Sequence, residues 1–273
     1  SDGSQIVCGP CDDAQRAAKA AQPDREGEIY RRLPELIAEN RREILSRYPR
    51  ILRRVSGYNL DAFVPEIYEN SPVAPIARQL DADWPDRKQF NLARLIVGAE
   101  GTLGTVVEAV LHIVPLPKER GVVCLQFQTI DTALEAVGKI LDCRPSAVEL
   151  LDRNIVELSR TNLKYRKSLD FVAGTPEALL IVEFSADDPL HVADALQLLE
   201  QKMHGQPGLE RFLPARDAEM REQIWNCRKA GAPLLLSIPG ARKPIAFVED
   251  TAVDTTKLPE FTRRFRAILE RHG

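Results

Sequence analysis

The sequence predicts an α+β protein whose C-terminal part is a ferredoxin-like antiparallel sheet with helices on one face. After about residue 118, short apolar runs rich in β-branched residues alternate with amphipathic helical patterns. This order is typical of either a parallel sheet or a ferredoxin-like one. The predicted strands place polar residues between apolar ones, as in Leu125-Gln126-Phe127-Gln128. That alternation favours the antiparallel sheet, because a sheet covered on both faces would have strands that are apolar throughout.

The first 118 residues are expected to form a domain of helices, loops and one glycine-rich turn. A helix is predicted over 12–21 and a clearer one over about 29–48, where apolar residues recur at helical spacing. Residues 55–90 contain four prolines and are predicted to be loop. Over 93–114 the pattern predicts a strand, a bend from Gly98 to Gly104 and a second strand rich in β-branched residues.

Residues 119–273 are expected to form the second domain, with the boundary near 118–120 after Pro115 and Pro117. Periodicity predicts strands at about 122–127, 146–151, 179–184 and 244–250, and helices at about 131–142, 152–161, 188–203, 215–230 and 257–271.

Composition excludes several classes of protein. With 44% hydrophobic and 28% charged residues, the chain is neither disordered, collagen-like nor a disulfide scaffold. A formal net charge of −3 argues against a nucleic-acid partner. No apolar run approaches the roughly 18 residues of a membrane span, and no signal peptide opens the chain. We therefore expect a cytoplasmic protein without a membrane span. Because the first residue is Ser rather than Met, we also expect part of the function to lie outside this chain.

The string Cys8-Gly9-Pro10-Cys11 offers one enzymatic hypothesis. Two thiols at this spacing before a helix can form an exchangeable disulfide with a lowered thiol pKa. A thioredoxin-like domain, however, needs a βα unit before the motif, and only seven residues precede Cys8. A surface pair without redox function is therefore the preferred interpretation. No metal site is expected, because the other cysteines are not spaced with histidines as zinc ligands are.

The segment Gly98-Ala99-Glu100-Gly101-Thr102-Leu103-Gly104-Thr105 is the most informative part of the sequence. It lacks the Lys of a phosphate-binding loop and does not open a helix, so neither nucleotide-binding glycine motif applies. A glycine-rich bend lets backbone N–H groups approach a flat or anionic ligand closely. A tight hairpin corner without a ligand is the alternative.

This segment, extended to Arg94–Ala109 and followed by Leu116-Pro117, resembles the end of the FAD-binding domain in the FAD-linked oxidase family. That family includes the flavin-binding component of glycolate oxidase, D-lactate dehydrogenase and D-2-hydroxyglutarate dehydrogenase. Upstream, residues 53–60 resemble its Thr/Ser-Gly-Tyr-Asn/Asp-Leu stretch, and downstream 148–152, 225–228 and 247–250 match its substrate-side cap domain in order and spacing. The sequence of residues 243–253 resembles in particular that of large bacterial members in which an iron–sulfur half follows the flavin half.

The resemblance implies FAD as cofactor and a 2-hydroxy acid as substrate. Residues 1–118 would then be the C-terminal portion of a flavin-binding domain, and 119–273 the cap. The flavin would contact the residues of the glycine turn and the strand after it: Glu100, Gly101, Thr102, Gly104 and Val106. The family's catalytic histidines would lie after Gly273, so no catalytic residue is expected in this chain.

The substrate carboxylate calls for a planar bidentate donor, which Arg provides. Arg228 is the candidate, because it stands at the family's Trp-x-x-Arg position. A surface salt bridge with Glu222 or another acid is the alternative. Lys243 could add a second positive charge, or be a solvent-facing loop residue. Hydroxyglutarate-type members carry Lys where this chain has Val248, so a second substrate carboxylate is not expected to be bound as in those members.

Two hypotheses therefore stand. In the first, the full-length protein is an FAD-dependent D-2-hydroxy-acid dehydrogenase, and this chain alone is inactive. In the second, the chain is a non-catalytic binding module, with the Cys8/Cys11 redox role as its enzymatic rival.

Overall fold

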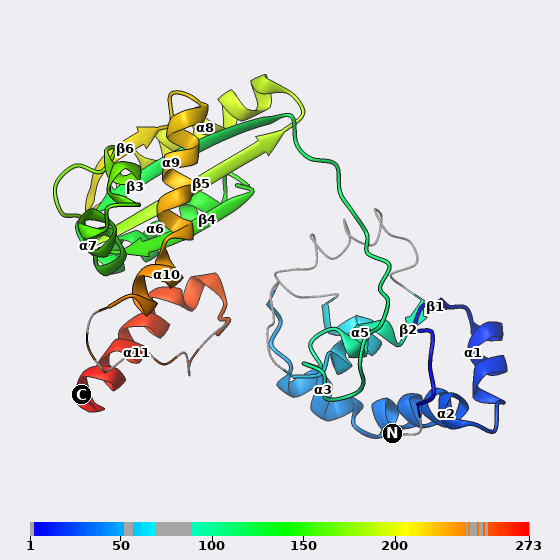
Figure 1. Ribbon diagram of the computed structural model, residues 1–273. Coiled ribbons are helices and arrows are strands. Elements are labelled where there is room, and N and C mark those ends of the chain that lie inside the picture. The colour runs from blue at the N-terminus through cyan, green and yellow to red at the C-terminus, as the bar shows by residue number, and fades with distance from the viewer. Residues whose placement is uncertain are drawn as a thin grey trace. The chain divides into compact units, whose positions relative to one another are not determined.

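The computed structural model describes residues 3–51, 57–68, 89–238, 240, 245, 248 and 251–272 (Figure 1). These form two compact units. Unit 1 comprises Ser1–Leu111 with Val248–Ala252, and unit 2 comprises His112–Phe247 with Val253–Gly273. No helix in the described part of the chain is long and apolar enough to cross a membrane.

Unit 1 is mainly helical. It contains β1 (Pro10–Cys11), α1 (Asp13–Ala20), α2 (Arg25–Glu39), α3 (Arg41–Arg47), the 3-10 helices η1 (Leu60–Phe63) and η2 (Pro65–Tyr68), β2 (Phe90–Asn91) and α5 (Ala93–Ile96). Helix α1 begins in a capping box, in which Asp12 accepts from the Gln15 backbone N–H and Gln15 accepts from that of Asp12. The predicted helix over 29–48 is two helices, because Asn40 ends α2 by donating through its side chain to Leu36 O at 2.9 Å. Tyr30, Leu33 and Ile44 lie in the core of this unit.

The prediction of two strands over 93–114 is wrong. Residues 93–96 form helix α5, whose start is fixed by the Ala93 N–H donating to Asn91 Oδ1 at 2.8 Å. Residues 103–116 have no regular secondary structure, and Val107, Val110 and Ile113 are more than 80% exposed. β-branched residues favour a strand only where a neighbouring strand packs against them, and no such strand lies beside this segment among the described residues.

Unit 2 contains a four-stranded sheet in the order β4-β5-β3-β6, with every neighbouring pair antiparallel. The strands are β3 (Glu119–Phe127), β4 (Ala147–Asp152), β5 (Ala178–Ala186) and β6 (Leu209–Pro214). The helices are α6 (Ile130–Leu141), α7 (Arg153–Thr161), η4 (Arg166–Leu169), α8 (Pro189–Met203), α9 (Ala218–Lys229), α10 (Gly231–Leu236), η5 (Thr255–Lys257) and α11 (Leu258–His272). β6 and α10 were not predicted, and most of the strand predicted at 244–250 lies outside the described residues.

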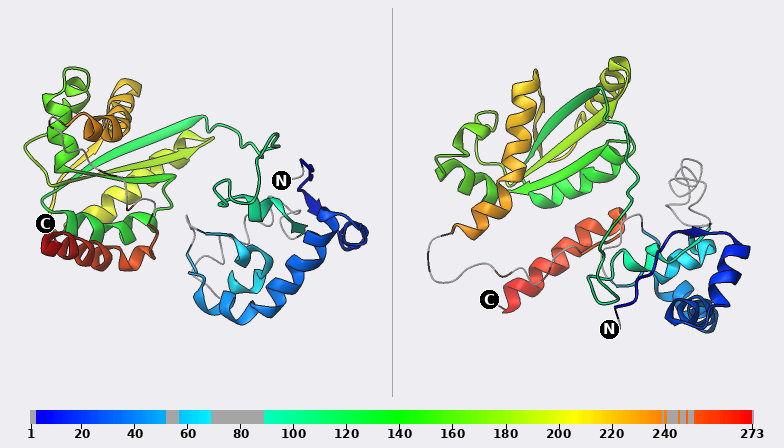
Figure 2. Two further views of the ribbon diagram at one scale, coloured as in Figure 1. Left: turned by 60° about the horizontal axis from the view of Figure 1, so that its bottom comes forward. Right: turned by 45° about the vertical axis from the view of Figure 1, so that its right-hand side comes forward.

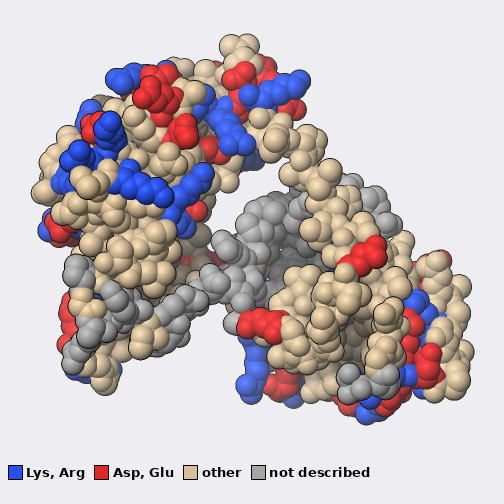
Figure 3. All heavy atoms as spheres, in the orientation of Figure 1, with Lys and Arg blue, Asp and Glu red and all other residues tan. Residues whose placement is uncertain are grey.

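The sheet of unit 2 is covered on both faces, which corrects the expectation of helices on one face (Figure 2). Val123, Leu125 and Phe127 point toward α6 and α8, whereas Val122 and Cys124 point toward α7 and α9. The polar residue that indicated a solvent-facing side, Gln126, is 1% exposed and donates to Phe171 O at 3.4 Å. A buried amide is tolerated because it is hydrogen-bonded, so the alternation did not mark an exposed face. Outside the core, charges of both signs are intermixed over the visible face of unit 2 (Figure 3).

Candidate functional site

The glycine turn (residues 98–104) of unit 1 is an ordered feature. The Thr102 N–H donates to Ala99 O at 3.0 Å, which closes a four-residue turn. Its two central residues have positive φ, 50° at Glu100 and 76° at Gly101, as in a type I′ turn. Glycine adopts this region freely, whereas Glu100, which carries a Cβ, is strained in it.

The inner side of the glycine turn is bonded to the rest of unit 1. The Thr102 hydroxyl donates to Ala99 O at 2.6 Å and lies 2.9 Å from the Tyr58 hydroxyl. Ala99 is 4% exposed. The segment 57–60, which the sequence singled out separately, therefore lies beside the turn.

The outer side of the glycine turn is open. A Cβ placed on Gly101 or Gly104 would meet nothing within 4 Å, and Glu100 and Val106 are exposed. Of the five predicted cofactor residues, Glu100, Gly101 and Thr102 share the turn, while Gly104 and Val106 belong to the irregular segment after it. A fixed turn with accessible backbone fits one edge of a flat ligand such as a flavin.

In unit 2, α9 packs against one face of the sheet. The helix begins at Asp217, whose carboxylate accepts from the Met220 N–H at 2.8 Å, and this bond holds the Asp217 pKa below its usual value. Near the other end of the helix, Trp225 Nε1 donates to Glu183 Oε2 at 2.8 Å and Arg228 Nε donates to Glu149 Oε2 at 2.8 Å.

The predicted substrate residue Arg228 thus has an acidic partner, although it is Glu149 and not Glu222. The side chains of Arg228 and Glu149 are 45% and 35% exposed, so the pair itself contributes only about 0–1 kcal/mol to stability. Nε makes the ion pair, and the terminal guanidinium nitrogens donate no hydrogen bond among the described residues. That edge can accept a further carboxylate. Lys243 lies outside the described residues.

The Cys8/Cys11 pair has none of the features of a reactive dithiol. All five cysteines are free. Cys11 is buried on β1 with its Sγ 3.7 Å from the Tyr30 hydroxyl. Burial, with the charge of Glu26, raises the pKa of Cys8, which is opposite to the shift that a nucleophilic thiol requires. No cluster of His, Cys, Asp and Glu that could hold a metal occurs in the described ranges.

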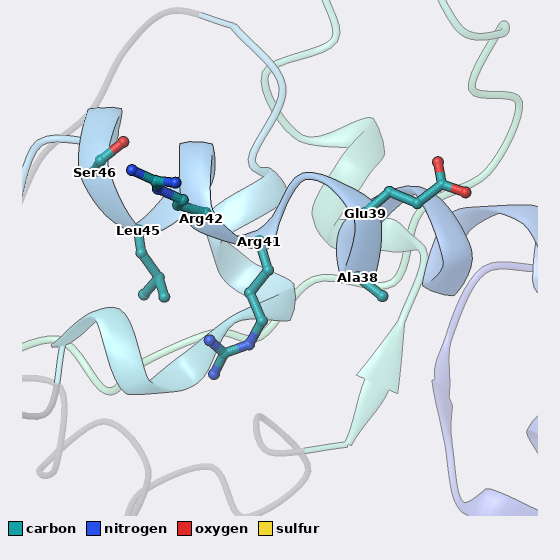
Figure 4. A pocket seen from close by; sticks show the side chains of 6 residues that line it. All are labelled: Ala38, Glu39, Arg41, Arg42, Leu45 and Ser46. Carbon is teal, nitrogen blue, oxygen red and sulfur yellow. The ribbon is translucent and has the colours of Figure 1, made fainter.

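A shallow hollow of about 500 Å³ lies on α2 and α3, lined by Ala38, Glu39, Arg41, Arg42, Leu45 and Ser46 (Figure 4). The side chains of Arg41 and Arg42 point in different directions from α3, and Arg41 pairs with Glu66 outside the hollow. The two cations do not converge, so the hollow lacks the arrangement of an anion site.

Sequence reasoning did not find the acidic partners Glu149 and Glu183. Both stand at polar positions in strands, which were interpreted as solvent-facing. The register places Ala147 opposite Glu183 and Glu149 opposite Ile181, so the two carboxylates are diagonal neighbours on the α9 side of the sheet. The spacing of Trp225 and Arg228, three residues apart, indicates only that the two side chains share one face of the helix.

Residues 116–273 match the family model of FAD linked oxidases, C-terminal domain. Because the match covers more than half of the chain, the chain belongs to the FAD-linked oxidase family.

Among individual relatives, the chain is 32% identical to D-2-hydroxyglutarate dehydrogenase of Pantoea ananatis, over 93% of this chain and 24% of that protein. It is 28% identical to the protein of the same name from Escherichia coli strain K12, over 90% of this chain and 23% of the relative. It is 27% identical to a mitochondrial D-lactate dehydrogenase [cytochrome] of Arabidopsis thaliana, over 66% of this chain and 30% of the relative. The chain thus spans about a quarter of the length of the hydroxyglutarate dehydrogenases it matches.

Proposed function

We propose that the full-length protein is an FAD-dependent dehydrogenase that oxidises a D-2-hydroxy acid of the lactate, glycolate or 2-hydroxyglutarate type. The observation that carries the proposal is the similarity over nearly the whole chain to D-2-hydroxyglutarate dehydrogenases. The described chain by itself is inactive in this proposal, because no residue in it is placed as a catalytic base.

The flavin contacts would come from the glycine turn and the residues just after it: Glu100, Gly101, Thr102, Gly104 and Val106. When bound, FAD supplies the acceptor for the hydride of the substrate α-carbon. The contribution of this chain is positional. The open backbone at Gly101 and Gly104 admits a flat ring at van der Waals distance, where a side chain would stand in the way.

Substrate binding would fall to Arg228, with Lys243 as a second cation. The Nε contact to Glu149 leaves the terminal edge of the guanidinium for the carboxylate that every 2-hydroxy acid carries. One carboxylate bound bidentately is enough to orient the α-carbon. By the resemblance, Val248 stands where hydroxyglutarate-type members have Lys, so a second substrate carboxylate would not be bound as it is in those members.

The domain assignment is part of the proposal. We infer that 1–118 is the C-terminal portion of a flavin-binding domain and that 119–273 is a ferredoxin-like cap. The chain order of the strands, which places the first cap strand between the third and the fourth, supports the split βαβ topology of that fold. The length of the relatives supports a longer polypeptide, which we place in the cytoplasm. The amino-acid sequence of residues 243–253 supports an iron–sulfur half within it.

The test is made with the full-length protein. Its visible spectrum should show the flavin bands, and anaerobic addition of D-lactate, glycolate or D-2-hydroxyglutarate should bleach them, whereas L-lactate should not. A full-length protein that carries no flavin, or a flavin that no 2-hydroxy acid reduces, would exclude the proposed activity.

A further inference from the structure

We propose that Asn59 and Tyr58 are positioning residues that hold the glycine turn in the conformation that meets the flavin. The inference rests on the proposed function for its ligand, but the contacts that carry it lie within unit 1. We call these two residues the 58–59 clamp.

Asn59 stabilises the end of helix α5. Its Nδ2 donates to Val97 O at 2.8 Å and to Arg94 O at 3.3 Å. The last carbonyls of a helix lack partners within the helix, and α5 has only four residues, too few to be stable alone. Because both acceptors are carbonyl oxygens, the side-chain nitrogen of Asn59 must face them. An amide from another segment thus caps the helix immediately before the glycine turn.

The backbone at Gly98 shows how closely the two segments approach. Gly98 has a φ of 85°, and a Cβ on it would lie 3.2 Å from Gly57 O and 3.5 Å from Asn59 Nδ2. A side chain would be strained at this φ, and its Cβ would press on Gly57 O, in the residue just before the clamp. Glycine at this position is therefore favoured by the backbone conformation and by the close approach of the segment that carries the clamp, separately from any ligand.

Tyr58 fixes the far end of the same turn. The single hydroxyl proton of Thr102 is directed to Ala99 O, so in the 2.9 Å contact with Thr102 Oγ1 the Tyr58 hydroxyl must be the donor. Tyr48 in turn donates to Tyr58 O at 2.7 Å. The clamp therefore bonds the turn both before Gly98 and after Gly101, while the open side of Gly101 and Gly104 receives no contact from it.

The experiment uses Asn59→Asp in the full-length protein, which keeps the size of the side chain but replaces the donor by a carboxylate facing two carbonyls. Because the two carbonyls at the end of α5 lose their donor, amide hydrogen exchange over 97–104 should rise about threefold to tenfold. The dissociation constant for FAD should increase by a similar factor, while the KM for the hydroxy acid in FAD-saturated enzyme should stay unchanged. Asn162→Asp is the matched control, because Asn162 Oδ1 accepts from the Lys164 N–H and Asp retains that acceptor.

Unchanged exchange over the turn in Asn59→Asp would overturn the clamp. Faster exchange with unchanged FAD affinity would overturn its role toward the flavin. If Asn59→Asp does not fold, Tyr58→Phe, which removes one hydroxyl at the surface, should still speed exchange at Thr102 and weaken FAD binding about threefold to tenfold. A wild-type protein without flavin would instead refute the proposed function, and the exchange result would still decide whether the clamp holds the turn.

Discussion

Gly121 of β3 allows helix α8 to lie close to the sheet, and Gly121→Ala tests that packing directly. A Cβ at this position would lie 2.6 Å from Val192 Cγ1 and 2.9 Å from Leu196 Cδ1. Val192 is buried and its branched side chain has little rotamer freedom. Overpacking of this kind costs about 1–3 kcal/mol, and replacing a strand glycine returns about 0.5–1 kcal/mol. Taking the middle of both ranges, we expect a net destabilisation of about 1 kcal/mol, or about 2–4 °C in Tm.

The assay is urea unfolding followed by the fluorescence of Trp225 in a Trp84→Phe background, so that unit 2 alone is reported. Val192→Ala removes the methyl group that collides, so the double variant should be more stable than the sum of the single changes by about 1 kcal/mol. Gly138→Ala is the control with opposite sign. Gly138 is exposed within α6 with nothing near its Cβ position, so alanine should stabilise by about 1 kcal/mol. If Gly121→Ala is as stable as wild type, or if Val192→Ala does not compensate it, the packing argument is refuted.

Substitution, thiol chemistry and acid unfolding test the other sites. Arg228→Lys in the full-length enzyme should raise KM strongly with little change in the flavin spectrum, because Lys cannot pair bidentately; unchanged kinetics would remove Arg228 from the substrate site. Thiol titration of the native chain should find Cys8 more reactive than Cys124, whose complete burial raises its pKa; equal rates would contradict the described burial. The lowered pKa of Asp217 stabilises the folded state above the unfolded value of about 3.9, and this stabilisation is lost as pH falls through the folded pKa. Asp217→Asn, which retains a capping oxygen, should show a shallower loss of stability in acid; an identical acid profile would refute the assignment.

Long amphipathic helices could be predicted from the sequence to within a few residues. Helix α6, predicted at 131–142 and observed at Ile130–Leu141, combines strong apolar periodicity with a Thr129 cap. Helix α5 could not be predicted, because the short apolar run of 93–97 is compatible with helix or strand, and contacts from Asn91 and Asn59 decide between them. β6 was missed because Glu210 and Arg211 interrupt its apolar pattern.

For the candidate site, the sequence singled out the glycine turn and Arg228 but could not identify what holds them. The partners Tyr58 and Glu149 are far away in sequence, 44 and 79 positions from Thr102 and Arg228. Neither pairing produces a periodic pattern in the sequence, because each pair of residues meets only when the register of the sheet and the path of the loops are fixed. The burial of Gln126 escaped prediction for the same reason, since its acceptor Phe171 O lies 45 positions away.

The position of β3 inside the sheet affects how unit 2 folds during synthesis. Val123 pairs with Val182 on one side and with Pro214 on the other, so neither edge of this strand can be satisfied by residues close to it in the chain. Sheets closed by such distant pairs fold slowly, because the loops between the strands must be ordered first. During synthesis, the apolar residues of β3 leave the ribosome well before β6 exists. The nascent chain therefore exposes its central strand until Pro214 has emerged, and this interval is when unit 2 is most open to aggregation and to chaperones.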